Sequence, residues 1–142
     1  MATTREAKRA DLKRRLVDAA EAQILDRGLA GLKAREVTAQ AGCALGALYT
    51  AFEDLDMLVL HVNARTLARL GAALHAACPK DGAPEDILQA LAGAYVAFAC
   101  ANQRLWSALF EHRLPEGVEM PDWHRQDHAV LIAEIIAPLG RL

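Results

Sequence analysis

Hydrophobic residues in the first part of the chain recur at intervals of three and four positions. Over residues 9–27 the recurring positions are Leu12, Leu16, Ala19, Ala20, Ile24 and Leu25. This spacing places them on one face of an amphipathic helix. Gly28 follows directly, where a left-handed residue commonly ends a helix, so the pattern predicts a helix over 9–27 capped by Gly28.

Two short apolar stretches follow this helix. One covers residues 34–41 and ends at Gly42, and the other covers about residues 45–52. Helices of about two turns are unstable alone, so both must pack on the first helix. A tight turn at Gly42 would make the pair a helix-turn-helix, although a plain helical hairpin fits the same pattern. The residues predicted to face inward are Val37, Ala41, Leu48 and Phe52.

The rest of the chain has a longer helical pattern. A helix is predicted over 54–77, with Asp54 as its N-cap, followed by a break at 79–84. Further helices are predicted over 84–102, 104–113 and 122–137, the last ending before Pro138. The predicted fold is all-α, with a three-helix head at residues 1–53 and a helical body at residues 54–142.

Composition agrees with an all-helical protein. Alanine and leucine dominate the 142 residues, and the net charge is −2. That charge is unevenly divided, because residues 1–52 carry an excess of three positive charges and residues 53–142 an excess of five negative charges. A basic first third suits a head that meets phosphate groups.

Several classes of protein are not expected. No apolar run is long enough to span a membrane, and no secretory signal opens the chain, so a cytoplasmic location is predicted. Cys43, Cys78 and Cys100 are odd in number and form no metal-binding pair. No catalytic motif occurs, so neither an enzyme nor a bound cofactor is expected.

Aromatic residues concentrate in the predicted body. Five of the seven lie there, and with a methionine and three histidines they are candidates for an apolar ligand pocket. Each of them taken alone fits a core position better than a pocket. His124 and His128 lie four apart on one helix face, but no third ligand has suitable spacing, so no metal is expected. The candidate ligand-binding residues are His61, Tyr95, Phe98, Trp106, Phe110, Met120, Trp123, His124 and His128.

The run EVTAQAGCALGALYTAFEDLDMLVLHV, residues 36–62, resembles the signature of the tetracycline-repressor (TetR) family of transcriptional regulators. The resemblance extends over about 50 residues, from ILDRGLAGLKAREV through the Ala41-Gly42 turn to the long helix after Phe52. A looser resemblance covers residues 104–123, which are similar to the ligand-domain variant that carries a Trp-His-Gly motif. The chain ends before that motif would occur.

The resemblance implies that the head at residues 1–53 binds DNA and that the body at residues 54–142 binds ligand and dimerises. It further implies a homodimer that binds a palindromic double-stranded DNA operator and is released by a small hydrophobic effector. It places Tyr49 and Thr50 at phosphate or base contacts, and Arg35 and Thr38 at backbone contacts. Ala44, Leu45 and Ala47 would lie in the major groove. The basic residues predicted to attract phosphate are Arg5, Lys8, Arg9, Lys13, Arg14 and Arg15.

Three positions depart from the family pattern. Many members have a polar residue and a lysine where this chain has Ala44 and Leu45, and a lysine where it has Leu55. These departures leave open a helical interaction protein of the same fold with weakened or lost DNA binding. A small helical enzyme is a more distant alternative. In the family, two further helices form most of the dimer interface, and the sequence ends at LIAEIIAPLGRL, where those helices would begin. Either they lie outside this sequence or dimerisation uses another surface.

Overall fold

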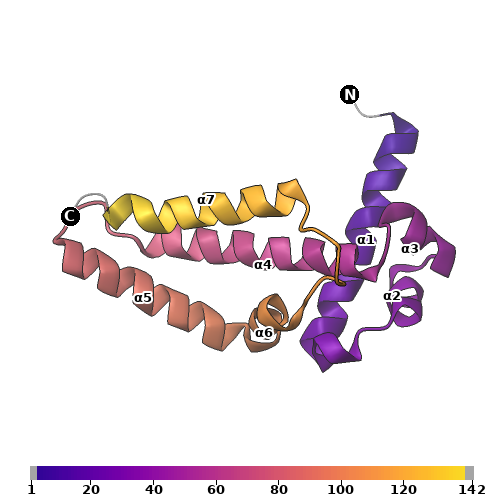
Figure 1. Cartoon of the computed structure of the whole chain (residues 1–142), viewed down its shortest axis with the longest axis horizontal. Helices are drawn as coiled ribbons and strands as arrows, with labels where there is room; N and C mark the ends of the chain where they lie inside the picture. The colour runs from indigo at the N-terminus through magenta and orange to yellow at the C-terminus, as the bar shows by residue number, and fades with distance from the viewer. Residues whose placement is uncertain (1–2, 140–142) are drawn as a thin grey trace.

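The computed structural model describes residues 3–139, with side chains up to residue 133. Within that range it contains seven α-helices and one short 3₁₀ helix, and no strand (Figure 1), which confirms the all-α prediction. The elements are α1 (Thr4–Arg27), η1 (Leu29–Gly31), α2 (Ala34–Ala41), α3 (Leu45–Ala51), α4 (Leu55–Ala77), α5 (Pro84–Ala101), α6 (Gln103–Glu111) and α7 (Asp122–Leu139).

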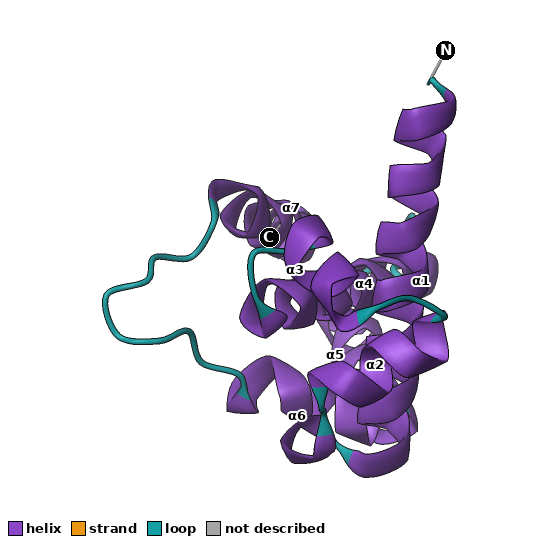
Figure 2. Cartoon of the chain, turned by 90° about the vertical axis from the view of Figure 1, so that its right-hand side faces the viewer, coloured by secondary structure: helices purple, strands orange, loops and turns teal. Residues whose placement is uncertain are grey.

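The helices form two groups (Figure 1). α1, α2 and α3 lie together at one end, and α4, α5 and α7 extend away from them as a long bundle. Short α6 lies between the groups and touches α1 as well as α4 and α5. The long loop between α6 and α7 projects to one side of the molecule (Figure 2).

Helix ends depart from prediction at four places. α1 begins at Thr4 rather than residue 9, because Thr3 and Glu6 form a capping box that stabilises an extra turn. Gly28 has a positive φ of 78° but a ψ of 171°, so it ends α1 outside the predicted left-handed helical region. α6 ends at Glu111 rather than 113. α7 continues through Pro138 to Leu139, a difference within the usual spread at helix ends.

The turn between α2 and α3 has the predicted geometry. Gly42 is left-handed, with φ 76° and ψ 38°, a conformation that costs glycine little. The four residues predicted to face inward on either side of it are all buried. Because each short helix buries a side chain of 0% exposure, Val37 in α2 and Leu48 in α3, packing stabilises helices that are too short to form alone.

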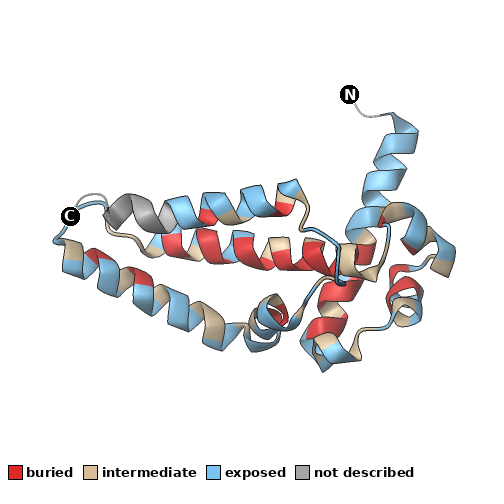
Figure 3. Cartoon of the chain, viewed as in Figure 1, coloured by how far each residue is buried: buried red, intermediate tan, exposed pale blue. Residues whose placement is uncertain are grey.

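A single core joins the head to the body. It contains Leu16, Ala20 and Ile24 of α1 together with Leu58 and Val62 of α4, and it also takes in two residues of α6. Figure 3 shows this buried band where α1 meets α4, while the first turns of α1 are exposed. The division at residue 53 stays a prediction, and the packing is continuous across it.

A second core lies further along the bundle. Leu70 and Leu74 of α4, Ile87 and Leu91 of α5, and Leu131 of α7 form its centre. The side chains of Phe98 and Trp106 pack against this cluster without being fully buried. This core holds the three long helices together and gives the body its shape.

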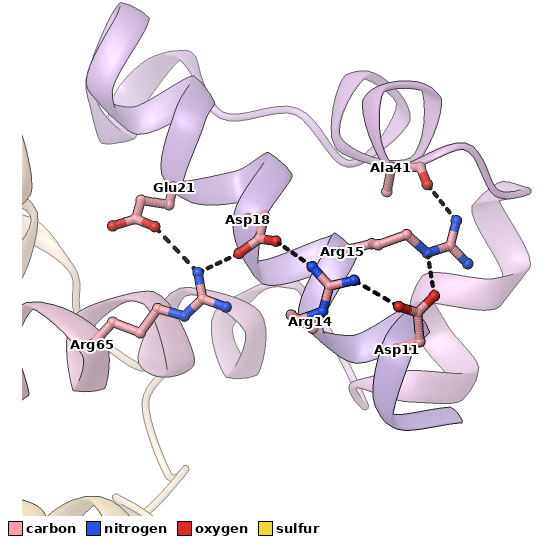
Figure 4. Close-up of polar contacts among 7 residues, drawn as sticks. All are labelled: Asp11, Arg14, Arg15, Asp18, Glu21, Ala41 and Arg65. Atoms are coloured by element: carbon pink, nitrogen blue, oxygen red, sulfur yellow. Dashed lines mark hydrogen bonds and ion pairs between the residues drawn. The ribbon is translucent and has the colours of Figure 1, made fainter. Parts of the chain in front are cut away.

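An ion-pair network also links α1 to α4. Glu21, which is nearly buried, accepts hydrogen bonds from Arg65, at 3.2 Å, and from Arg69. Asp18 accepts from Arg65 at 2.6 Å and from Arg14 at 3.2 Å (Figure 4). Arg65 and Arg69 of α4 are therefore both held by acidic residues of α1.

The network predicts a local cost for neutralising Glu21. We expect Glu21→Gln to lower the free energy of unfolding by about 1–3 kcal/mol, because two guanidinium groups lose a charged and nearly buried acceptor. Asp26→Asn is the control, since Asp26 is exposed and its pair with Arg27 is 3.6 Å long. Urea unfolding should show a change below about 0.5 kcal/mol for the control. Equal effects of the two substitutions would contradict this account.

Candidate nucleic-acid interface and effector cavity

The outer face of α3 is exposed and carries no charged residue. Tyr49 is 51% exposed, and Ala44, Gly46 and Thr50 are exposed beside it. A Cβ added at Gly46 would meet nothing within 4 Å, so no neighbour in the fold demands glycine there. The helix therefore presents a small, uncharged surface with a tyrosine and a threonine at its far end.

The other predicted DNA-contacting residues are placed unequally. Arg35 is exposed on α2, while Leu45 and Ala47 are half-buried on α3. Thr38 is only 3% exposed, and its hydroxyl donates to the Ala34 and Arg35 carbonyl oxygens within the same helix. Thr38 thus lies in the core of the head and is not part of the exposed surface.

The basic residues of α1 divide into two sets. Arg14 and Arg15 are engaged within the molecule: Arg14 pairs with Asp11 and Asp18, and Arg15 donates to the Ala41 carbonyl oxygen at 2.7 Å (Figure 4). The hydrogen bond from Arg14 is the main cause of the lowered pKa of Asp11. By its bond to Ala41, Arg15 secures the turn between α2 and α3.

The second set lies on the projecting part of α1. Arg5, Lys8 and Arg9 make no ion pair with any described residue and are exposed. Lys13 lies over the Phe52 ring, 5.8 Å from its centroid. Three free cations on one exposed segment beside the head form a surface that attracts phosphate.

A cavity of about 270 Å³ lies in the body between α4, α5, α6 and α7. It is lined by six of the nine predicted ligand-binding residues: Tyr95, Trp106, Phe110, Met120, His124 and His128. The aromatic rings touch edge to face, with Trp106 5.0 Å from Tyr95 and 5.2 Å from Phe110. Such a lining, mostly apolar with a few polar groups, is typical of small-molecule sites.

The other three predicted residues lie elsewhere. Phe98 packs behind Trp106, at a centroid distance of 6.3 Å. His61 and Trp123 stack at 4.4 Å in a second hollow of about 420 Å³, beside Lys13 and Arg65 at the junction of α1 and α4. The structure thus separates these rings from the first cavity.

Two polar residues of the cavity were missed from the sequence. Asn63 and His112 both line it. Asn63 occupies an inward position of α4 among leucines and valines, and a polar residue in such a pattern was the available signal. His112 follows α6 and could not be placed from periodicity.

Two buried polar atoms of the cavity lining lack partners. Asn63 and His124 are each 3% exposed, and neither Oδ1 of Asn63 nor Nδ1 of His124 has a hydrogen-bond partner among the described residues. Burial lowers the pKa of His124, and His128 adds to this effect while Asp127 opposes it. The His124 ring is therefore neutral at pH 7.

The cavity is joined to the head by α6. Leu105 and Ala108 on one face of α6 belong to the core of the head, and Trp106 and Leu109 on another face line the cavity or pack beside it. Arg104 donates to the Leu25 carbonyl oxygen at the end of α1, at 2.8 Å. α6 therefore contacts both the head and the cavity.

A polar contact makes a second connection. Nε2 of His112, whose residue lines the cavity, lies 2.9 Å from the Asp56 carboxylate in the first turn of α4. Because a carboxylate only accepts, Nε2 carries the hydrogen. Asp56 lies five residues after α3, so a movement of His112 would displace a residue next to the helix-turn-helix.

No protein-family model and no curated protein matches the chain. Among solved structures, a protein of unknown function from Rhodococcus sp. RHA1 is 25% identical, with a TM-score of 0.74 over 92% of this chain and 66% of that one. A putative TetR-family regulator from Vibrio parahaemolyticus is 18% identical, with a TM-score of 0.67 over 92% and 68%. The chain has the TetR fold. A TetR-family regulator from Thermus thermophilus matches over 98% and 68%, at 18% identity and a TM-score of 0.59.

The chain spans about two thirds of the length of these solved chains. The looser resemblance of residues 104–123 to the Trp-His-Gly variant of the TetR fold stays a prediction. Among the described residues, no helix has both the length and the apolar character that crossing a membrane requires.

The lowered pKa of His124 predicts a pH effect on stability. The unfolded ring, with a pKa of about 6.5, takes a proton more readily than the folded one. Stability should therefore fall as the pH drops below about 6.5, and less so in His124→Gln. The folded ring is affected by His128, Asp127, His112 and His61, and the pKa of His61 is itself lowered by burial.

Urea unfolding between pH 7.5 and 5 measures this effect. The control is His75→Gln, which removes an exposed histidine at the end of α4. The control curve should run parallel to that of the wild type, whereas the His124→Gln curve should be flatter. Parallel curves for all three proteins would refute the assignment.

Proposed function

We propose that the protein is a ligand-responsive transcriptional regulator, acting as a repressor, that binds a palindromic operator as a homodimer. The observation that carries the proposal is the exposed face of α3 set beside the free cations of α1, on a fold shared with TetR-family regulators. Family membership, dimer and operator are all part of the proposal.

The two surfaces of the head would make different contributions to binding. Arg5, Lys8 and Arg9 supply attraction to phosphate that does not depend on sequence. α3 enters the major groove, where Ala44, Leu45 and Ala47 meet thymine methyl groups. Tyr49 donates a hydrogen bond to phosphate or a base edge, and Arg35 contacts the opposite backbone from α2. The Thr50 hydroxyl donates to the Gly46 carbonyl oxygen at 3.1 Å in the unbound head, and it turns to the phosphate or accepts from a base amino group when DNA binds.

The body would supply the response to a small hydrophobic effector. A molecule bound in the cavity touches Trp106 on α6 and lies beside His112. Displacing α6 or the His112–Asp56 contact shifts the end of α1 and the start of α4, the two segments that hold the helix-turn-helix. Release of DNA then follows if the effector favours the displaced arrangement.

Selection from a random duplex library tests the proposal. Enrichment of a palindrome, bound with steep salt dependence, would support a dimeric operator-binding regulator. Failure to enrich any sequence, with weak binding that salt abolishes, would overturn it in favour of an interaction protein of the same fold. The uncharged face of α3 is the observation that supports this second candidate.

Substitutions on α3 should separate affinity from folding. We expect Tyr49→Ala with Thr50→Ala to weaken binding of the selected duplex at least about tenfold, because each lost hydrogen bond is worth about 1 kcal/mol. Val96→Ala, at an exposed residue of the body that does not line the cavity, is the control and should bind DNA like the wild type. Fluorescence anisotropy with labelled duplex measures both.

The cations of α1 should govern salt dependence. Arg5→Ala with Arg9→Ala should reduce the slope of log affinity against log salt by about two units per protomer, with sequence preference unchanged. An unchanged slope would mean that the projecting part of α1 does not meet the phosphates.

A further inference from the structure

We propose that the cavity selects an uncharged, two-ring-sized apolar ligand bearing a hydroxyl group, and that Asn63 and His124 hold that hydroxyl. The inference rests on the proposed role of the cavity as the effector site and specifies the chemistry of its ligand. It is carried by two buried polar atoms in the lining and by the absence of charge around them.

The size of the ligand follows from the volume. An apolar cavity of about 150 Å³ holds one benzene ring. The present cavity, at about 270 Å³, is nearly twice as large. A fused pair of rings, or one ring with a short alkyl chain, therefore fills it, and Trp106 and Tyr95 offer ring faces and edges to an aromatic guest.

The lack of charge follows from the lining. No Lys, Arg, Asp or Glu side chain lines the cavity among the described residues. Its polar groups are the Asn63 amide, the histidines, the Tyr95 hydroxyl and the Trp106 indole N–H, and the His124 ring is held neutral by burial. A carboxylate or ammonium group would lose its water without gaining a counter-charge, which is costly.

The hydroxyl follows from the unpaired atoms. Oδ1 of Asn63 and Nδ1 of His124 are buried without partners. The two ends of an amide exchange donor for acceptor when it turns over, and a neutral imidazole does so between tautomers. A hydroxyl both donates and accepts, so it satisfies either residue in any of these states. Carboxylates only accept and ammonium groups only donate.

Water provides the reference for this preference. Each of the two atoms has less than 1 Å² of accessible surface, so water in the cavity of the unliganded protein reaches it only when the amide or the ring turns over. A hydroxyl replaces that water with no hydrogen bond lost. A hydrocarbon of the same shape displaces the water and leaves Asn63 or His124 unpaired. Asn63 and His124 thus set specificity, while the rings around them supply most of the affinity.

Calorimetric titration with matched naphthalene derivatives tests the inference. The probes are naphthalene, 1-naphthol, 1-naphthoate and 1-naphthylmethylammonium. The measured quantity is the Kd of naphthalene divided by that of 1-naphthol, because comparing this ratio between variants cancels the differing affinity of the probes for water. We expect Asn63→Leu to lower the ratio at least about tenfold, the effect of one buried hydrogen-bonding group.

Two further variants keep the result interpretable. Thr66→Val is the control, since Thr66 is buried on the same helix but outside the cavity, and it should leave the ratio unchanged. His124→Phe removes the other polar atom with little change in shape, and it serves if Asn63→Leu does not fold. It should lower the ratio in the same direction.

Three results would overturn the inference. These are a ratio that is the same in every variant, no binding of 1-naphthol at 1 mM, or tighter binding of 1-naphthoate or 1-naphthylmethylammonium in competition with 1-naphthol. None of them depends on DNA. Failure here with a palindrome enriched would remove only the ligand class, and 1-naphthol binding without enrichment would remove only the operator.

Discussion

The contact between α1 and the first half of α4 is the one on which the rest of the structure depends. Apolar side chains from both helices fill the core of the head, and α2 and α3 pack against it. Glu21 adds direction to this contact, because a nearly buried carboxylate must keep its two arginine partners on α4. A shift of α4 along α1 would unpair that charge as well as open the core. The orientation of the helix-turn-helix is therefore set by the body.

α6 connects the cavity to the core that α1 and α4 form. It is only nine residues long, yet one face completes the core of the head and another borders the cavity. A chain of ring contacts runs in parallel, from Phe52 through His61 and Trp123 to His124. Neither route requires a flexible hinge. Since packed interfaces tend to switch between discrete arrangements, a small change in the cavity can reach the head as a repacking.

Most of the fold could be predicted from the sequence because helical periodicity marks buried faces directly. The inward positions of α2 and α3 and the N-cap at Asp54 followed from local rules alone. The capping box of Thr3 and Glu6 was equally visible, and overlooking it shortened α1. The cavity was harder. Its rings were foreseeable as a group, but the register of α7 against α4 decides that Trp123 lies outside, and only tertiary neighbours decide whether Asn63 finds a partner.

Contacts within the head explain why some basic side chains of α1 are free to meet phosphate and others are not. Arg14 and Arg15 look like phosphate ligands in the sequence, yet they hold α1 and the turn at Ala41 in place, which leaves the cations of the first turns free. Attraction to DNA would then reside on α1 rather than on the face of α3. An uncharged recognition surface contributes little to non-specific binding of DNA. Its contacts add affinity only where the shape and the methyl groups of the DNA fit that surface. On the proposed function, the absence of charged side chains from α3 trades affinity for discrimination rather than abolishing recognition.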